Sequence, residues 1–593
     1  GGLGGSWEVP HTPRGVVTGL APASADRSSG RDVHCQTHTL TPPTLAASTH
    51  LCSHLPLPRI TREEAPMNAP ARTVADINPA TGQPFFELAE TDLSQLPAMF
   101  EKARAAQKVW AMKSFPERAE HIFKMRRYIV DNAEALSKTV SQSNGKTLTD
   151  ALATEVLPCA LACNWYGKNA AKVLKPKIRG GGHLLFFNKR TRMLRLPLGV
   201  VGIISPWNYP LSIPFGEIVM ALMSGNAVML KVAAATPAVG RAIEEIVAAG
   251  DLPEGLFNHV VGSGAAVATA FFENKVDKLF FTGSVNAGKV LMAQAAETLT
   301  PLSLELGGND AMIVLEDADL ERAANGAAWG GYQNAGQSCG GVERIYVVEK
   351  VYDEFVRLLA SKTRALRHGV GCENFDVDIG SITTEGQLRT VQQHLEDAVQ
   401  KGATIAAQSQ PVGPQDGLFH PATMLIDVSD EMLTMKDETF GPIVAVAKVK
   451  DQEEAIRRAN DSNLALTSSV WTRDNKRGQA VAARLETGVT TINDHLYTHG
   501  LSETPWGGWK ESGLGRTHGP EGLEEMTHAK VVNWDMLGTK RNLWWYPFNE
   551  ETWRGLLNAL RFAFPKSAGQ WFSASMALTP FLLKKMFTGW KTD

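Results

Sequence analysis

The sequence is poor in cysteine, in long apolar runs and in excess charge of either sign. Its 593 residues hold six cysteines, and no two of them form a CxxC pair. This scarcity excludes a disulfide scaffold, argues against a metal site and favours a reducing compartment. No uninterrupted run of about 18 apolar residues occurs, so we expect no membrane-spanning helix. The 59 basic and 62 acidic residues give a net charge of −3, which argues against binding of nucleic acid.

What the chain does contain is typical of a globular protein. Hydrophobic residues make up 44% and charged residues 20% of it, enough for two or three domains with a sizeable core. Residues 1–66 differ, because they are rich in Pro, Ser, Thr, His and Gly and follow no helical or strand period. We interpret them as a disordered N-terminal tail or translated upstream sequence, with Met67 as the natural start. A transit peptide is the alternative.

The rest of the chain predicts an α/β fold. Helical patterns dominate residues 93–171, and two alternating runs within 183–197 flank Asn188-Lys189, which predicts a β-hairpin arm. Apolar strands such as "LGVVGIIS" and "KLFFTGS" then alternate with helical stretches, and a second such block follows Glu305. This order is typical of doubly wound parallel sheets. We expect two α/β domains joined in a compact body, followed by an amphipathic extension over 538–593.

One cysteine, Cys339, lies in "YQNAGQSCGGVERI" between a serine and two glycines. A thiolate attacks carbonyl carbon well, but a free thiol has a pKa of about 8.5 and must be activated. Gly340 and Gly341 would let a substrate approach the backbone closely. The alternative is an inert buried thiol, and the local sequence leaves both interpretations open.

Two further residues favour a reactive Cys339. Glu305, in "LSLELGGND", follows an apolar run and precedes two glycines. A carboxylate in such surroundings can have a raised pKa and serve as a general base, although it can also be a solvated loop residue. Asn208, in "ISPWNYP", carries an amide that can donate to a developing oxyanion, although Asn beside Pro also marks turns. Together they favour acyl chemistry on the sulfur.

Two features point to a phosphate-bearing ligand. The stretch "FFTGSVNAGK" follows an apolar strand, and its Gly283 and Gly288 flank a helix start at which backbone N–H groups could meet a pyrophosphate. Lys231, at the end of "NAVMLK", could reach a ribose or a phosphate, or could be merely solvated. Neither stretch has the GxGxxG pattern.

Six motifs occur in an order that resembles the aldehyde dehydrogenase superfamily. They are "PWNYP", "FTGS", "ELGGND", "GQSC", "ETFGP" and "PWGGWKESGLGR", and the resemblance runs from about Met67 to about Asp535. It implies an aldehyde-dehydrogenase-like fold of two doubly wound parallel-sheet domains, in which 67–303 binds NAD or NADP and 304–498 is catalytic. Residues 499–537 would return to the cofactor domain and form an oligomerisation segment. It also implies that the hairpin arm pairs with another subunit, giving a homodimer or homotetramer.

The resemblance implies an NAD(P)-dependent oxidoreductase that converts an aldehyde to a carboxylic acid. Cys339 would attack the aldehyde to give a thiohemiacetal, and Asn208 with the Cys339 backbone N–H would hold the oxyanion. Hydride would pass to the nicotinamide, and Glu305 would activate the water that hydrolyses the thioester. By matching position, the cofactor contacts would be Lys231, Gly283, Ser284, Glu438, Phe440, Ser205 and Trp207. A CoA-acylating enzyme and a catalytically inactive scaffold protein remain the alternatives; Glu305 favours water over CoA as the acyl acceptor.

Two departures from the family pattern affect cofactor and pocket. Ala234, in "KVAAATP", falls where an acidic residue often holds the adenosine ribose, so NADP is accepted more readily and the choice between NAD and NADP stays open. Cys339 is followed by "GGVERI" instead of the family's usual "TA" or "IA" type, which would shape the pocket.

The substrate and the chain's surroundings are less constrained by sequence. We expect "NDHLYTHGLSETPWGG" to line the aldehyde entrance through His495, Tyr497 and His499, without indicating which aldehyde enters. The extension 538–593 joins aromatic clusters to basic residues, which suits either a helix docked on the body or peripheral membrane contact. The protein is otherwise expected to be cytoplasmic.

Overall fold

The computed structural model describes residues 72–372 and 375–590, all of which belong to one compact unit, Pro70–Asp593. The N-terminal tail predicted for residues 1–66 lies outside these residues. The first described elements are the antiparallel strands β1 (Thr73–Ile77) and β2 (Pro84–Ala89) and the helices η1 (Leu93–Gln95), α1 (Leu96–Met112), α2 (Phe115–Asp131), α3 (Ala133–Asn144), α4 (Leu148–Ala151), η2 (Leu152–Val156) and α5 (Leu157–Leu174). Helix α2 begins at a capping box: Ser114 N–H donates to Glu117 Oε2 at 2.6 Å and Glu117 N–H donates to Ser114 Oγ at 3.4 Å.

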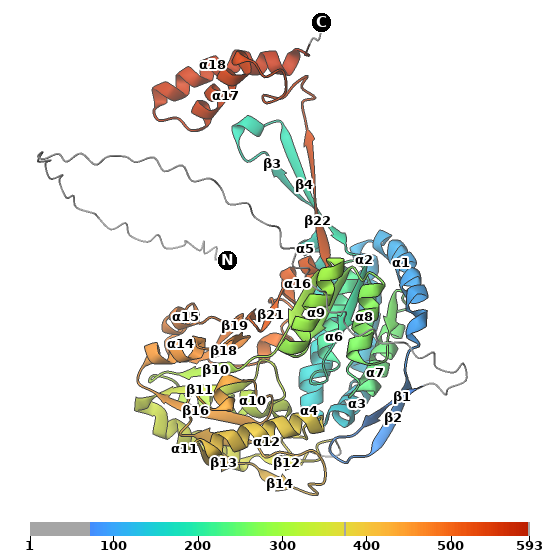
Figure 1. The fold of residues 1–593 in the computed structure, drawn as a ribbon, viewed down its shortest axis with the longest axis vertical. Helices are drawn as coiled ribbons and strands as arrows, with labels where there is room; N and C mark the ends of the chain where they lie inside the picture. Colours follow the sequence, from blue (N-terminus) through green and yellow to red (C-terminus); the bar gives the residue numbers. More distant parts are fainter. Residues whose placement is uncertain (1–71, 373–374, 591–593) are drawn as a thin grey trace, which may run out of the picture. The chain divides into compact units, whose positions relative to one another are not determined.

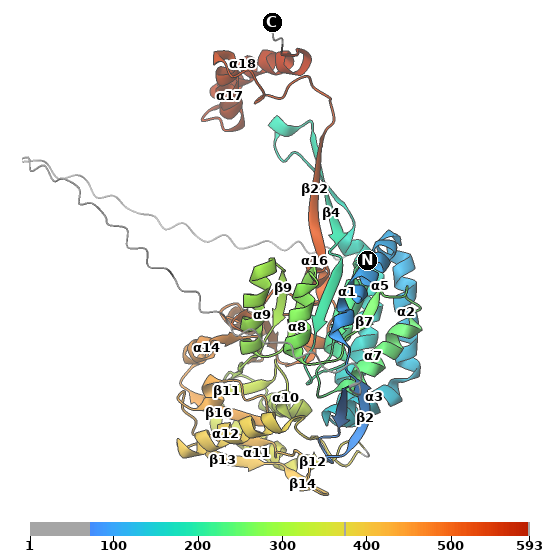
Figure 2. The ribbon, with the colours of Figure 1, turned by 45° about the vertical axis from the view of Figure 1, so that its right-hand side comes forward.

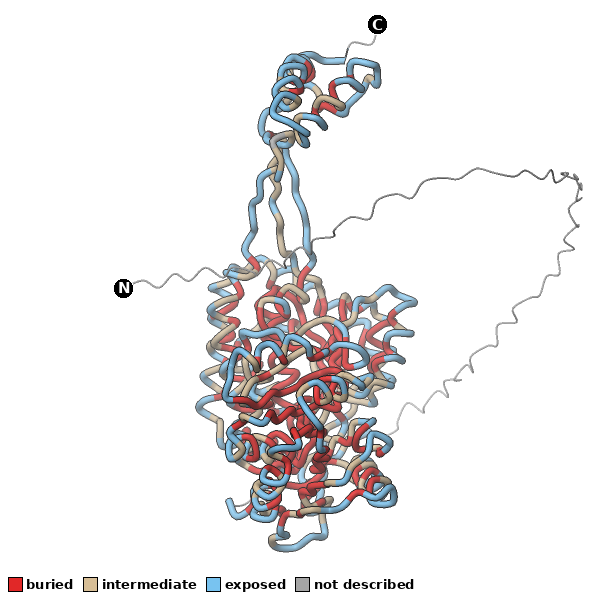
Figure 3. The backbone as a smooth tube through the Cα atoms, turned by 90° about the vertical axis from the view of Figure 1, so that its left-hand side faces the viewer, coloured by how far each residue is buried: buried red, intermediate tan, exposed pale blue. Residues whose placement is uncertain are grey.

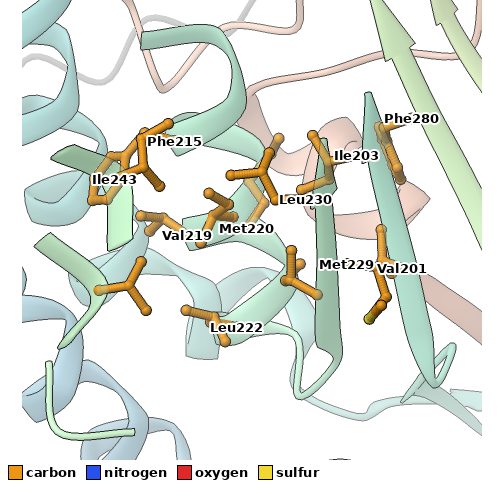
Figure 4. Close-up of a cluster of buried hydrophobic side chains, with 14 of the residues drawn as sticks. Val201, Ile203, Phe215, Val219, Met220, Leu222, Met229, Leu230, Ile243 and Phe280 are labelled. Carbon is orange, nitrogen blue, oxygen red and sulfur yellow. The ribbon is translucent and has the colours of Figure 1, made fainter. Parts of the chain in front are cut away.

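The first large sheet has the strand order β21-β9-β8-β5-β6-β7, in which only β21 is antiparallel. Its strands are β5 (Val200–Ile204), β6 (Ala227–Lys231), β7 (Phe257–His259), β8 (Lys278–Thr282), β9 (Leu302–Glu305) and β21 (Gly513–Leu514), and its helices are α6 (Ser212–Met223), α7 (Pro237–Ala249), α8 (Gly264–Glu273) and α9 (Val285–Thr298). Every residue of β5, β6 and β8 is buried, as expected for parallel strands covered on both faces. Figure 4 shows Phe215, Val219 and Met220 of α6 against the side chains of β5 and β6.

The second large sheet has the strand order β13-β15-β16-β11-β10-β18-β19, with β13 antiparallel. Its strands are β10 (Asp310–Val314), β11 (Val342–Val348), β13 (Thr404–Gln408), β15 (Thr423–Ile426), β16 (Ile443–Val449), β18 (Thr467–Trp471) and β19 (Val489–Ile492); its helices are α10 (Leu320–Tyr332), α11 (Glu349–Ala365), α12 (Glu385–Gln400), α13 (Leu433–Lys436), α14 (Gln452–Asn460) and α15 (Asn475–Ala482). Alternate residues enter different cores: Met312 packs with residues of α10 and α11, whereas Ile313 packs with residues of α14 and α15. The period of two places helices on both faces. Both sheets therefore confirm the predicted doubly wound α/β fold.

Several short elements lie outside the two large sheets. They are η4 (Gln333–Gly336), β12 (Arg367–Gly369) paired with β14 (Gln410–Val412), β17 (Leu464–Ala465) paired with β20 (Trp509–Lys510), η5 (Tyr497–Gly500) and α16 (Gly519–Glu525). The chain passes from the first sheet to the second between Glu305 and Asp310, so the boundary predicted at 303/304 falls inside β9. It returns to the first sheet through β21, which pairs with β9.

The arm is a three-stranded sheet of β3 (Lys177–Gly180), β4 (Lys189–Pro197) and β22 (Thr527–Asp535), with β4 in the centre (Figures 1 and 2). The hairpin turn predicted at Asn188-Lys189 is wrong, because β3 ends at Gly180 and residues 181–188 contain a short 3-10 helix, η3 (Leu184–Phe186). The strand ends at a run of glycines, and Gly182 has a φ of +71°, which favours glycine over other residues.

The C-terminal extension forms two helices, α17 (Glu550–Ala563) and α18 (Ala568–Phe587). They share a small core of Leu543, Ala559, Leu578 and Phe581, against which Leu185 of the arm packs. Figure 3 shows this region and the arm as largely exposed, whereas the two large sheets are buried. Within residues 72–372 and 375–590, no helix is long and apolar enough to cross a membrane.

Candidate active site

Cys339 lies in a constrained segment between α10 and β11. The three residues Asn334, Ala335 and Gly336 have φ angles of +54°, +52° and +69°, and a left-handed backbone at a non-glycine residue is strained. Asn334 is held there by its N–H, which donates to Asp150 Oδ2 at 3.1 Å, and by its side-chain amide, which donates to the Asn208 carbonyl at 3.0 Å. These bonds fix the course of the backbone that leads to the thiol.

His495 supports the same segment from the other side. Its Nε2 lies 2.8 Å from the Gly340 carbonyl, to which Thr467 Oγ1 also donates at 3.1 Å. Burial lowers the pKa of His495 to about 4, so the imidazole is neutral and Nε2–H donates. The expectation that His495 lines the aldehyde entrance is therefore wrong, because its ring is buried against the cysteine segment. Tyr497 and His499, by contrast, do line a cavity.

Two cavities meet at Cys339. The first, of about 240 Å³, is lined by Pro206, Trp207, Asn208, Thr282, Gly283, Ser284, Glu305, Leu306, Gly307, Cys339, Gln387, Thr390, Glu438 and Phe440. The second, of about 280 Å³, is lined by Ala153, Thr154, Leu157, Pro158, Leu161, Tyr209, Trp329, Gln333, Ser338, Cys339, Gly340, Leu496, Tyr497, His499, Gly500, Leu501 and Trp506. Cys339 is thus shared by a cavity that contains acidic side chains and a mainly apolar cavity that contains none, which is an arrangement suited to joining two ligands.

Glu305 lies at the end of β9 and lines the first cavity. Both of its carboxylate oxygens are buried and have no hydrogen-bond partner among the described residues. Burial raises its pKa well above the usual range, the charge of Glu217 adds to this, and Arg516 opposes it. An unpaired carboxyl group with a raised pKa is chemically suited to taking a proton.

Asn208 lines the same cavity, directly after Trp207. One N–H of its side-chain amide donates to the Gln337 carbonyl at 3.1 Å, which leaves the second N–H available because an amide nitrogen carries two donors. The backbone carbonyl of Asn208 accepts from Lys146 Nζ at 2.9 Å and from the Asn334 side-chain amide. These bonds hold the backbone of Asn208 in place.

The thiol of Cys339 is protonated in this environment. Burial raises its pKa, and the carboxyl groups of Glu438, Asp310 and Glu305 raise it further, while the Gly340 backbone lowers it. Burial likewise raises the pKa of Glu438 well above its usual range. The resting site thus retains its protons, and ionisation of the sulfur requires transfer of a proton to a neighbouring group.

Five of the predicted cofactor contacts lie around the first cavity: Trp207, Gly283, Ser284, Glu438 and Phe440. Glu438 Oε1 accepts from the Gly308 N–H at 2.9 Å, and a side chain at Gly307 would collide with the same carboxylate. The Trp207 and Phe440 rings meet edge to face at 5.5 Å.

The two remaining predicted contacts, Lys231 and Ser205, are absent from that lining and lie at the ends of the neighbouring strands β6 and β5. Among the described residues, the buried Lys231 ammonium has no hydrogen-bond or ion-pair partner, and burial lowers its pKa to about 8. A Cβ at Gly264, the first residue of α8, would lie 3.7 Å from Lys231 Nζ. Ser205 Oγ is likewise buried without a partner. An orphaned cation and hydroxyl beside a helix N-terminus fit an anionic ligand such as the pyrophosphate of a dinucleotide.

Sequence reasoning missed Glu217 and most of the second cavity. Glu217 is the one acidic or basic residue of α6, Ser212–Met223, and it is buried. Burial raises its pKa to about 8. A charged residue inside a buried apolar helix is unusual, and that signal was present in "PFGEIVMALM". A cavity of about 10 Å³ lies between Glu217, Glu305, Cys339, His499 and His518, about the space of one water molecule.

The chain belongs to the aldehyde dehydrogenase family, whose sequence profile matches residues 67–532. This confirms the membership predicted from the six motifs.

Curated relatives match over nearly their whole length. A protein of Mycobacterium ulcerans (strain Agy99) named "Putative succinate-semialdehyde dehydrogenase [NADP(+)] 2" is 38% identical over 486 residues, 80% of this chain and 92% of that protein. The "4,4'-diapolycopene aldehyde oxidase" of a Methylomonas species is 35% identical over 493 residues, 82% of this chain and 91% of that protein. The structure of an NAD+ complex of aldehyde dehydrogenase from Bacillus cereus is 32% identical and covers 78% of this chain and 94% of that one, with a TM-score of 0.73.

Proposed function

We propose that this protein oxidises an aldehyde to a carboxylic acid with NAD or NADP as the hydride acceptor, through a covalent intermediate on Cys339. The observation that carries the proposal is the meeting of a thiol, an unpaired carboxyl group and an amide donor around one cavity, supplied by Cys339, Glu305 and Asn208. Membership of the family supports the same reaction class.

The roles of the three residues follow from their chemistry. The Cys339 sulfur bonds to the carbonyl carbon, and its proton passes to a neighbouring carboxyl group or to solvent. The free N–H of Asn208 and the Cys339 backbone N–H donate to the oxyanion that forms. The thiohemiacetal on Cys339 would become a thioester by losing a hydride, for which a bound NAD(P)+ would supply the acceptor. Glu305 then takes a proton from the water that attacks the thioester, so the acid leaves and the thiol is restored.

We assign the cofactor to the first cavity and to the strand ends beside it. Lys231 and Ser205 would hold the phosphate and ribose part, and Glu438 and Phe440 the nicotinamide part. Ala234 is exposed and offers no carboxylate to repel a 2′-phosphate, so both NAD and NADP are candidates. The Mycobacterium relative is named for NADP+ and the Bacillus structure holds NAD+, which agrees with leaving both open.

A panel of aldehydes with each cofactor tests the proposal through the absorbance of the reduced cofactor. We expect reduction that depends on aldehyde and yields the free acid. An acyl-CoA product that forms only with added CoA would replace the hydrolytic reaction by the acylating one. The absence of reduction with every aldehyde and both cofactors would favour the inactive scaffold protein.

We also propose that the arm joins subunits into a homodimer or homotetramer. Its sheet carries exposed apolar side chains, among them Ile178, Val531 and Trp534, which are 67%, 54% and 41% exposed. A three-stranded sheet with apolar faces and open edges is stabilised by pairing with another chain. Light scattering of the purified protein would report the mass, and a monomer at micromolar concentration would oppose this assignment.

The extension supports contact with the surface of an anionic bilayer. Helix α18 has a second apolar face besides its packed one: Phe572, Met576, Leu583 and Phe587 are 63%, 65%, 51% and 71% exposed, and their spacing aligns them on one side. Residues 538–593 hold eight lysines and arginines against three acidic residues, a net charge of +5 in a chain of net −3. Exposed aromatic residues beside positive charge suit an anionic lipid interface.

Liposome flotation of the full chain tests this contact. We expect flotation with vesicles that contain phosphatidylserine, weaker flotation with phosphatidylcholine alone, and loss in the variant Phe572→Ser/Phe587→Ser. Met112→Ser, at an exposed apolar position on α1 outside the arm and the extension, is the matched control. Equal flotation of parent and variant rejects the lipid contact, and a change of mass in the variant would assign the face to a second copy instead.

A further inference from the structure

The second cavity contains no charged side chain. Its lining combines leucines with aromatic rings, and no Lys, Arg, Asp or Glu of the described chain contributes to it. Its outer residues keep large apolar surfaces in contact with solvent: Leu157, Leu161, Trp329 and Tyr497 are 51%, 44%, 46% and 48% exposed. The route to the sulfur from this side therefore carries no charge, and its rim is mainly apolar; the polar side chains of the lining are neutral ones such as Thr154, Gln333 and Ser338.

The titratable groups in the lining are neutral at physiological pH. Burial lowers the pKa of His499 to about 4, and burial raises the pKa of the Tyr209 hydroxyl above its usual value. Cys339 remains a thiol for the reasons given above. No group in the lining thus supplies a positive charge that could bind a carboxylate.

Lys146, a buried cation beside the lining residue Tyr209, already has partners. Lys146 Nζ lies 4.3 Å from the centre of the Tyr209 ring, on which it packs. It forms a fully buried ion pair with Glu155 at 2.6 Å and donates to the Asn208 carbonyl. Glu155 Oε2 in turn accepts the N–H groups of Leu211 and Ser212 at 3.0 and 2.8 Å. Breaking such a buried pair is costly, so Lys146 is not available to a substrate.

We infer that the second cavity selects uncharged apolar aldehydes and rejects aldehydes that carry a carboxylate. The inference rests on the proposed function and narrows its substrate class. A carboxylate drawn into this cavity would lose its water and find no cation. Only neutral donors face it, among them Gln333 Nε2 and Ser338 Oγ, which have no hydrogen-bond partner among the described residues. Neutral donors compensate a buried charge far less well than a cation does, so the transfer is unfavourable. An alkyl or aryl chain would gain from burial against the leucines and rings. This chain therefore differs in substrate from what the name of its Mycobacterium relative would suggest.

Matched pairs of aldehydes test the inference on the full-length enzyme. The pairs are butanal with succinate semialdehyde and hexanal with 6-oxohexanoate, each equal in chain length and different in one carboxylate. We expect kcat/KM to be at least about 100-fold higher for the uncharged member of each pair. Along the series from propanal to octanal, kcat/KM should rise by up to about fourfold per methylene until the cavity is filled.

A charge introduced into the rim should reverse part of this preference. Leu161→Arg places a guanidinium in an exposed lining position, so kcat/KM for succinate semialdehyde should rise at least about tenfold relative to butanal. Val109→Arg, at a 63% exposed position on α1 outside the cavity, is the control and should leave the ratio unchanged. A shift of equal size in both variants would show a general charge effect and would count against the cavity.

The outcomes separate this inference from the proposed function. If both members of each pair are oxidised equally well, or the carboxylate member better, the inference is wrong while the aldehyde oxidation stands. If no member of any pair reduces NAD or NADP, the proposed function itself is wrong.

Discussion

The two cavities that meet at Cys339 are similar in volume, about 240 and 280 Å³, but differ in the charge of the side chains that line them. The first is bounded by glycines, by the unpaired carboxyl of Glu305 and by Glu438, whereas the second is bounded by leucines and rings without charge. The reacting groups thus sit on one side and the groups that would choose a substrate sit on the other. The difference teaches that chemistry and selectivity are separable in this fold. Of the variants below, Cys339→Ala alters the residue that both cavities share, whereas those at Glu305, Ala234 and Glu217 leave the lining of the second cavity unchanged.

The largest effect should come from the residue that both cavities share. Cys339→Ala removes the atom that would bond to the aldehyde, so turnover should fall by on the order of 10⁴-fold or more. Binding of NAD or NADP, measured by calorimetry, should persist because the cofactor-side contacts remain. Cys372→Ala is the control. Turnover close to that of the parent in Cys339→Ala would remove the sulfur from the mechanism.

A change confined to the first cavity should separate two steps of the reaction. Glu305→Gln keeps the shape of the side chain but cannot take a proton, so thioester hydrolysis should slow by about 10²- to 10⁴-fold. A burst of reduced cofactor, about one per active site, should remain visible by stopped flow because acyl formation precedes hydrolysis. The exposed Glu273→Gln is the control. Steady-state turnover at the parent's rate would contradict the role of Glu305 as base.

The cofactor end can be altered without touching either reacting group. Ala234→Glu introduces a carboxylate near the expected ribose, so kcat/KM for NADP should fall about tenfold relative to NAD through charge repulsion of the 2′-phosphate. Ala234→Gln has the same size without the charge and should leave the ratio near the parent's. An unchanged ratio in both variants would mean that the ribose lies elsewhere.

The contrast between the cavities also explains what the sequence could predict. Cys339, Glu305 and Asn208 lie in short motifs whose residue types signal chemistry, so local reading located them. The parallel sheets were predictable because strands buried on both faces are continuously apolar. Leu157, Leu161 and other lining residues of the second cavity resemble ordinary core or surface residues. They line a cavity only because α5 packs beside η5 and α10, and no short sequence pattern indicates that packing.

Two predictions from the sequence, the turn of the hairpin and the position of His495, are wrong for specific physical reasons. The hairpin turn was assigned to Asn188-Lys189 because Asn in a short polar pair is a common turn signal, but the glycines at 180–182 end the strand earlier. His495 was grouped with Tyr497 and His499 because the three are close in sequence. The backbone turns at Leu496, whose φ is +64°, and so His495 faces the cysteine segment while the other two face the cavity.

The smallest effect concerns the two unpaired glutamates that share the 10 Å³ cavity. The pKa of Glu305 is raised first by burial and then by Glu217, and it is lowered by Arg516. The other titratable side chains that line this cavity are His499, His518 and Cys339. Burial lowers the pKa of His518 to about 3, and His499 is neutral as well, so the imidazoles do not offset the carboxylates.

Because two interacting acids ionise as a pair, Glu217 delays the ionisation of Glu305. A base that must lose its proton before it can act gives a reaction rate that rises with pH. The rate of thioester hydrolysis should therefore rise through neutral pH and above.

Glu217→Gln removes the competing charge, so Glu305 should ionise at lower pH. The rise of the hydrolysis rate with pH should then occur roughly one pH unit lower than in the parent. The preference for hexanal over 6-oxohexanoate should stay constant, since Glu217 does not line the second cavity. An unchanged pH dependence would show that Glu217 and Glu305 do not interact. A shift to higher pH would show that Glu217 favours the ionisation of Glu305, which contradicts the prediction. A changed preference would show that the two cavities are coupled.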